Sequence, residues 1–256
     1  MRTLRLILVT WLLQLKMRSR SAFDGLLSLL WPLFFATTVF LLFRSADQSA
    51  ALASAAVGAS VMGVWSATST TAAFALQQER RQGTLELLVA APTEFALIIV
   101  PVTLSMATIG AYSMAATLLW GRFVFGIDLV VHDPVRFLLS VLATVVAIGM
   151  LGFLIAISSV RYRSAWALGS ALEMPVWLIC GFLVPLDQLP QWVRPISWAL
   201  SPTWGMAAIR AAVDGRSPWL DLALCLGLAA AYGLVGYLLA RRMLNAARVH
   251  ATLALT

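Results

Sequence analysis

The sequence predicts an all-α polytopic membrane protein, and three observations support that fold class. Hydrophobic residues make up 61% of the 256 residues and charged residues only 11%, whereas soluble domains carry roughly a quarter of charged residues. The mean hydropathy is +0.89. Several apolar stretches reach the roughly 20 residues that a helix needs to cross a bilayer. Because backbone groups in lipid must bond within their own segment, we expect these stretches to be helices.

Six stretches meet the length criterion, so we predict six transmembrane helices in one transmembrane domain over residues 1–256. Five of the stretches carry no charge, and the fifth along the chain carries only Glu173. β-Barrel strands would be about 10 residues long with alternating polar positions, a pattern that these stretches lack. The predicted spans are residues 25–43, 50–76, 95–121, 137–160, 164–186 and 222–240.

The distribution of basic residues predicts that both termini are cytoplasmic. With the N-terminus inside, 12 of the 18 Lys and Arg residues fall in inner segments, which is the positive-inside bias of membrane proteins. The net charge of +7 then reflects topology and contact with anionic lipid, and we expect no nucleic-acid partner.

Two segments outside the spans are expected to touch the membrane. Residues 2–20 form a short apolar run with basic residues at both ends, which predicts an amphipathic helix on the inner membrane surface. Residues 187–221 contain four prolines and four of the ten tryptophans. Proline interrupts helices and tryptophan prefers the interface, so we predict short re-entrant helices in the outer leaflet; the alternative is an ordinary outer loop. The tryptophans that we single out are Trp192, Trp198 and Trp204.

Glu173 is the one ionisable residue clearly inside a predicted span. Ala165, Gly169 and Glu173 are spaced by four residues and share one helix face, where small residues let another helix approach closely. Pro175 should kink this span. An intramembrane carboxylate usually faces protein or a watery cavity. The face therefore lines either a dimer seam or a translocation path, or else Glu173 is a structural residue satisfied by a neighbouring helix.

The sequence lacks the motifs of the common catalytic and metal sites. There is no phosphate-binding loop and no H-E-x-x-H or G-x-S-x-G motif. The two histidines, His132 and His250, are far apart in the sequence. We expect no enzymatic activity, metal or cofactor in this chain. Cys180 and Cys225 each lie in a predicted span and are expected to be buried thiols.

The stretch "QQERRQGTLELLVAAP", residues 77–92, is a charged cytoplasmic segment between the second and third spans. Gly83 should end the helix of the second span, and Thr84 is a good N-cap for a short helix over residues 83–91. Thr93 is then expected to cap the third span, with Glu94 near its positive end. A short helix with an apolar face suits a groove on a soluble partner; alternatively the segment is a surface loop whose charges only satisfy topology.

This segment resembles the signature of the ABC exporter permeases of the second exporter class. The family pattern is an acidic residue followed by a base, then Gly-Thr-x-Glu, apolar residues and Pro. The "SPTWGMAAIR" stretch, which ends at Arg210, also resembles the family's Pro-aromatic-to-Arg run, and the resemblance extends over the whole chain. The residues that match the signature are Glu79, Arg80, Gly83, Thr84, Glu86 and Pro92.

The resemblance implies a permease subunit of an ATP-driven exporter in the bacterial cytoplasmic (inner) membrane. Such a permease pairs with a second permease, identical or paralogous, and with two cytoplasmic ABC ATPase subunits that hold ATP and magnesium. The apolar spans favour an amphiphilic or lipid-linked substrate. Alternatives are an ion-coupled transporter that uses Glu173 and a non-transporting membrane assembly subunit. The residues implied to contact the ATPase are Glu79, Arg80, Arg81, Gly83, Thr84, Leu85, Glu86 and Leu88.

Overall fold

The computed structural model describes residues 2–19, 22–45, 49–81, 83, 94–128, 131–161, 166–184 and 186–250. Within these residues the chain forms helices joined by turns, and no strand occurs. The elements in chain order are α1 (Arg2–Ser19), α2 (Ala22–Ser45), α3 (Ser49–Arg81), α5 (Phe95–Phe125), α6 (Pro134–Arg161), α7 (Trp166–Ile179), the 3-10 helix η1 (Leu186–Gln188), α8 (Arg194–Trp198), α9 (Ser201–Val213) and α10 (Trp219–His250).

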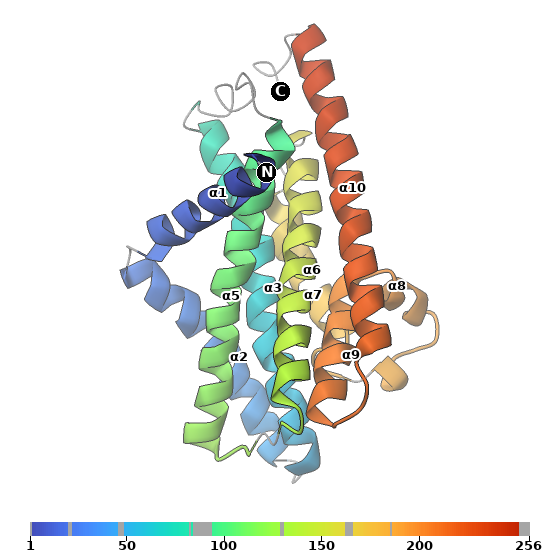
Figure 1. Cartoon of the computed structure of the whole chain (residues 1–256). Coiled ribbons are helices and arrows are strands. Elements are labelled where there is room, and N and C mark those ends of the chain that lie inside the picture. Colours follow the sequence, from blue (N-terminus) through green and yellow to red (C-terminus); the bar gives the residue numbers. More distant parts are fainter. Residues whose placement is uncertain are drawn as a thin grey trace.

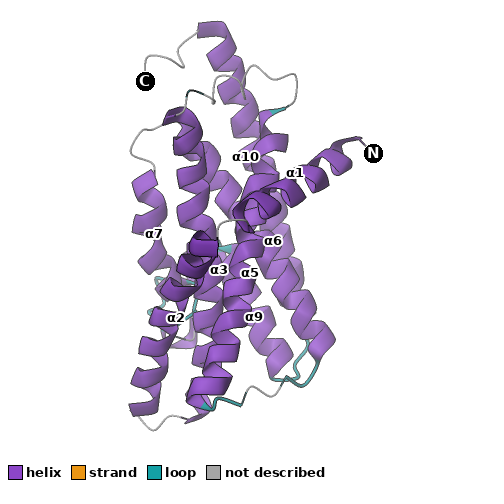
Figure 2. Ribbon diagram, turned by 90° about the vertical axis from the view of Figure 1, so that its left-hand side faces the viewer, coloured by secondary structure: helices purple, strands orange, loops and turns teal. Residues whose placement is uncertain are grey.

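The long helices lie side by side in one elongated bundle (Figures 1 and 2). α3 contacts α2, α5, α6, α7 and α9 and is more buried than α5, α6 and α10, so it is the central helix. α3 ends, α5 begins and α10 ends at the same end of the bundle, near the start of α1 (Figure 1). We call this the termini end. The loops from α5 to α6 and from α9 to α10 lie at the opposite end, which we call the far end.

Four helices of the described part are long and apolar enough to cross a membrane. They are segments of α3, α5, α6 and α10 and match the second, third, fourth and sixth predicted spans. α2 covers the first predicted span, although its described apolar portion is only Pro32–Phe43. The four candidate spans are Leu52–Ser69, Phe95–Phe125, Pro134–Ser158 and Trp219–Met243.

The prediction of one continuous helix over residues 164–186 is wrong, because α7 ends seven residues before residue 186. Gly181 has a φ of 77°, a left-handed conformation that glycine adopts without a steric cost. The amides of Gly181 and Phe182 donate to the carbonyls of Leu178 and Trp177 at 3.3 and 3.2 Å. These two bonds form a Schellman motif, which satisfies the last carbonyls of the helix and turns the chain away.

Glycines set the distance between α3 and its neighbours. A Cβ on Gly110 of α5 would lie 2.7 Å from the Cα of Val64, and a Cβ on Gly58 of α3 would lie 1.8 Å from the carbonyl oxygen of Phe182. Both contacts leave no room for a side chain. Close backbone approach at small residues is the usual basis of helix packing in membranes, so these glycines hold α5 and the turn after α7 against α3.

α1 packs across α5 near the termini end (Figure 1). The indole Nε1 of Trp11 donates a hydrogen bond to Thr108 Oγ1 at 3.1 Å. Leu15 is half-buried with Trp11, whereas Leu8 and Leu12 are exposed. The predicted apolar stripe of this helix is therefore divided between a face on the protein and an apolar face directed outward. Its position at the inner membrane surface stays a prediction.

α9 packs against α6 in the half of the bundle toward the far end, and the short helix α8 contacts α7 and α9 (Figure 1). Ser201 Oγ, at the start of α9, donates to the carbonyl of Ala147 at 3.4 Å. Ala147 lies thirteen residues after the first residue of α6, about 20 Å along that helix. At the other end of α9, the carbonyl of Val213 is 2.8 Å from His132 Nδ1. α9 therefore runs alongside the first half of α6, from the middle of the bundle to the far end.

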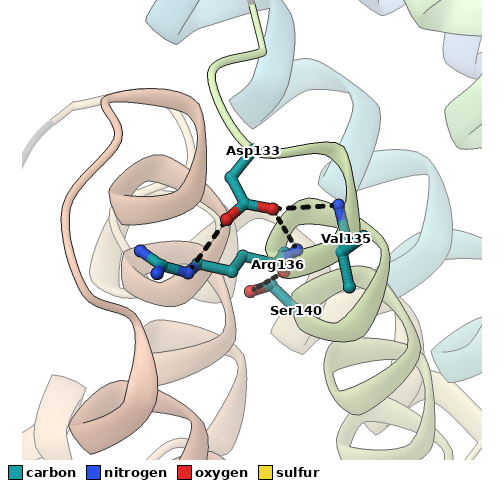
Figure 3. A network of polar contacts seen from close by, with 4 residues as sticks. All are labelled: Asp133, Val135, Arg136 and Ser140. Carbon is teal, nitrogen blue, oxygen red and sulfur yellow. Dashed lines mark hydrogen bonds and ion pairs between the residues drawn. The ribbon is translucent and has the colours of Figure 1, made fainter.

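The start of α6 is well defined by its capping residue (Figure 3). Asp133 Oδ1 accepts hydrogen bonds from the amides of Val135 and Arg136, both at 3.1 Å, while Asp133 Oδ2 pairs with Arg136 Nε at 3.0 Å. Ser140 Oγ donates to the carbonyl of Arg136 at 2.8 Å. Pro134 follows the cap at the first helical position, where its missing N–H is not needed.

Candidate functional site

The helix of the second span ends where the sequence predicts. Glu79, Arg80 and Arg81 form the end of α3, and their side chains lie outside the description. Gly83 follows with a φ of 71°, is exposed, and has nothing within 4 Å of the position that a Cβ would take. This glycine is thus required by the backbone conformation and not by packing.

The rest of the proposed ATPase contact lies outside the described residues. The short helix over residues 83–91 therefore stays a prediction, as do the roles of its side chains. The residues concerned are Thr84, Leu85, Glu86 and Leu88.

The description of the chain resumes at Glu94, and the expectation that Thr93 caps the third span is wrong. The N-cap of α5 is Glu94 and not Thr93, and the Glu94 side chain makes no capping bond. Its Oε1 instead accepts a hydrogen bond from the hydroxyl of Tyr237 in α10, at 3.1 Å. Phe95 and Ile99 pack directly below with residues of α6 and α10. The Glu94 carboxylate thus links the start of α5 to α10, and the packing of Phe95 and Ile99 supports the same contact.

The second group of candidate residues lies where α7 contacts α3. Ser66 Oγ of α3 donates a hydrogen bond to Glu173 Oε1, and Glu173 is half-buried. Ser66 is 15 residues before the end of α3, about 22 Å from the termini end of that helix. Gly169 lies one turn earlier on α7, and Ala165 is outside the described residues. The carboxylate is thus in the middle of the bundle.

Sequence reasoning predicted Glu173 but missed its partner. Ser66 is one of several hydroxyl residues in a long uncharged stretch, and no sequence signal distinguishes it from the others. Within the described part of the chain, the salt bridges are Asp133–Arg136 and Asp214–Arg216, both at the far end. Among these residues Glu173 therefore has no cationic partner.

A buried aromatic pair lies about one helical turn from this carboxylate. Trp177 follows Glu173 by one turn on the same face of α7 and is only 3% exposed. Its ring packs edge-to-face on Phe35 of α2, with the ring centroids 5.2 Å apart. The indole Nε1 of Trp177 is buried and has no hydrogen-bond partner among the described residues. α2, α3 and α7 thus meet at this level of the bundle, where Glu173 contacts Ser66 and Trp177 packs on Phe35.

The third group of candidate residues lies on the far-end helices. Trp192 and Trp198 are exposed, and the Nε1 of Trp204 donates to the carbonyl of Trp198 at 2.9 Å. Arg210 of α9 reaches the turn after α7, where its Nη1 is 3.9 Å from the position of a Cβ on Gly181. Of these residues, Arg210 thus lies near the end of α7.

A comparison of the sequence with protein-family models identifies the family of the chain. The model described as ABC-2 type transporter matches residues 5–213, which is well over half of the chain. The chain belongs to the ABC-2 type transporter family. As an ABC-2 permease it is a multi-pass membrane component of an ABC transporter, and ATP is hydrolysed by partner ABC ATPase subunits. A search of curated proteins finds no match for the chain.

The candidate residues of this ABC-2 permease occupy three levels of the bundle. The end of α3 and the start of α5 lie at the termini end, the Ser66–Glu173 contact lies in the middle, and α8 with α9 lies toward the far end (Figure 1). The match to the family model includes all three levels, because it ends at the last residue of α9.

Proposed function

We propose that this ABC-2 permease is the membrane subunit of an ATP-driven exporter. It moves an amphiphilic or lipid-linked substrate outward across the bacterial cytoplasmic membrane. It works with a second permease, identical or paralogous, and with two cytoplasmic ATPase subunits that hold ATP and magnesium. The observation that carries this proposal is the family match over residues 5–213, combined with the Gly83 turn at the termini end of the bundle.

In this proposal the termini end is cytoplasmic and the chain crosses the membrane six times. α7 has 14 residues, about 21 Å of helix, which is less than the hydrocarbon thickness of about 30 Å. α8 and α9 fill the remaining depth as re-entrant helices. The bond from Ser201 to Ala147 supports this arrangement, because it brings the start of α9 to the middle of α6.

The segment over residues 77–92 transmits the motion of the ATPase. Its short helix over residues 83–91 sits in a cleft of the ATPase, and closure of the ATPase pair pushes on it and on α1. The Gly83 turn lets this helix leave the direction of α3, while the contact of Glu94 with Tyr237 passes the displacement to α5 and α10. For this to work, ATP must bind one conformation of the complex better than the other.

The face of α7 that carries Ala165, Gly169 and Glu173 lines the seam between the two permeases or the path of the substrate. The small residues allow a close approach of helices. The residues of α7 on either side of this face support the proposal, because Leu172, Met174 and Leu178 are exposed in the single chain. These apolar side chains need contact with lipid, substrate or the second permease.

The test is co-expression of the chain with the ABC ATPase candidates of its own genome, followed by purification through the permease. We expect an ATPase to co-purify, and we expect inside-out vesicles that contain both proteins to take up a fluorescent amphiphile only with ATP. The change Glu79→Arg should abolish uptake, whereas Asp128→Arg, a matched charge reversal in the loop at the far end, should not.

Two results would contradict the proposal. Uptake driven by a proton gradient in vesicles without any ATPase would favour an ion-coupled transporter. Stable co-purification without ATP-dependent uptake of any amphiphile, drug or lipid-linked glycan in a panel would favour an assembly subunit.

A further inference from the structure

Glu173 is the only acidic side chain in the middle of the bundle among the described residues. The other described carboxylates are at the ends of helices, as Glu94 and Asp133 illustrate. A charged group at membrane depth is costly and usually has a partner. A carboxylate can accept about four hydrogen bonds, and the described contacts of Glu173 supply one, from Ser66. The chain thus places a carboxyl group at this depth and pairs it with no cation within the described residues.

The surroundings of Glu173 suit an amphiphilic cation. On one side, Trp177 lies one turn further along α7, is buried, and packs edge-to-face on Phe35, so this side of the carboxylate is apolar. On the outward side, Leu172 and Met174 are exposed and apolar. A molecule with a positive group and an apolar body would meet the carboxylate with the first and the exposed apolar side chains with the second.

We propose that Glu173, held in place by Ser66, binds a positively charged group of the exported molecule, so that the cargo is a cationic amphiphile. This proposal rests on the proposed function, because it takes the Glu173 face of α7 as part of the substrate path. It adds the sign of the charge on the substrate. It also assigns Ser66 a positioning role, because the bond to Oε1 leaves the other carboxylate oxygen for the cation.

Tetraphenylphosphonium and tetraphenylborate test the proposal, because they have nearly the same shape and opposite charges. Binding of each ion is measured by equilibrium dialysis with the purified permease in phosphatidylcholine nanodiscs, after subtraction of binding to empty nanodiscs. We expect saturable binding of tetraphenylphosphonium and none of tetraphenylborate. The change Glu173→Gln should weaken tetraphenylphosphonium binding at least tenfold, about 1.4 kcal/mol.

Two further variants make the result specific. Glu94→Gln removes a carboxylate that lies at the start of α5 and bonds Tyr237, and it should leave tetraphenylphosphonium binding unchanged. Ser66→Ala keeps the charge of Glu173 but removes the hydrogen bond, and it should weaken binding severalfold. Size-exclusion elution and thermal unfolding of each variant show whether it is folded. If Glu173→Gln does not fold, Glu173→Asp together with Ser66→Ala decides the question, since both should weaken binding while retaining the charge.

Equal binding of tetraphenylphosphonium to the wild-type chain and to folded Glu173→Gln would overturn the proposal, and so would equal binding of the two ions. Neither result affects the proposed function if an ATPase still co-purifies and drives uptake of a neutral amphiphile. Conversely, Glu173-dependent binding of the cation by a chain that captures no ATPase would leave the site intact and remove the exporter function. The two failures are therefore distinguishable.

Discussion

Substitution of Gly83 should uncouple ATP hydrolysis from transport in proportion to the backbone strain that it introduces. Gly83 has a φ of 71°, and no atom lies within 4 Å of the position of a Cβ. A side chain at this position therefore meets no steric obstacle outside its own backbone. For an L-residue other than glycine the left-handed conformation costs about 1–2 kcal/mol, which changes the equilibrium of the turn roughly 5- to 30-fold.

The expected order of the variants follows from their backbone preferences. Gly83→Asn should be mildest, because asparagine visits the left-handed region most readily after glycine. Gly83→Ala should bear the full cost. Gly83→Pro should be most severe, because proline fixes φ near −65°. Gly126, which ends α5 at the far end, has a φ of 65° and likewise nothing within 4 Å of a Cβ, so it is the matched control for strain.

The assay compares ATP hydrolysis and amphiphile uptake by the reconstituted complex for both glycines. Each alanine variant should lose a similar amount of thermal stability, because the backbone strain is the same. Only the Gly83 variants should lose the substrate-dependent stimulation of hydrolysis. The reasoning is refuted if Gly83→Pro couples normally, or if Gly126→Ala uncouples as strongly as Gly83→Ala.

Two further predictions concern packing and the anchoring of α5. Gly110→Ala should destabilise the permease by about 1–3 kcal/mol, because its Cβ would lie 2.7 Å from the Cα of Val64. In the same thermal unfolding assay Gly227→Ala should be neutral, because nothing lies within 4 Å of its Cβ position. Equal effects of the two changes would argue against the close approach of α3 and α5. Tyr237→Phe should cost about 0.5–1.5 kcal/mol through loss of the bond to Glu94, and Glu94→Gln should cost no more than that in a double-mutant cycle; fully additive effects would show that the two side chains do not interact.

Much of the bundle follows from hydropathy because a long apolar run must be helical in lipid. The predicted spans 137–160 and 222–240 lie inside α6 and α10, whose capping and ends extend them by a few residues or more. The early end of α7 does not follow in the same way. Gly181 lies in an apolar run much as Gly149 does in α6, and only the tertiary packing of the turn distinguishes them. Hydropathy cannot report that difference.

In the candidate site, too, some residues follow from local sequence patterns and others only from tertiary packing. Glu173 is evident from sequence because a charge in an apolar span is rare, and Gly83 is evident because it follows the charged residues that continue the second apolar span. Ser66 was missed because its role depends on which face of α3 meets α7. That face is set by the contact of Gly58 with the carbonyl of Phe182, two residues that are more than 100 positions apart in the sequence. Contacts of this kind are invisible to local patterns.

The most direct test of the central claim is a cross-link from the segment over residues 77–92 to the ATPase. Cys180 and Cys225 are both buried, so cysteines introduced by Leu85→Cys or Asp128→Cys can be labelled selectively with a photoreactive maleimide. After illumination of the active complex, we expect an adduct between permease and ATPase for Leu85→Cys and none for Asp128→Cys. A complex that is active in ATP-dependent uptake but gives no adduct from Leu85→Cys, or equal adducts from both positions, would contradict the account.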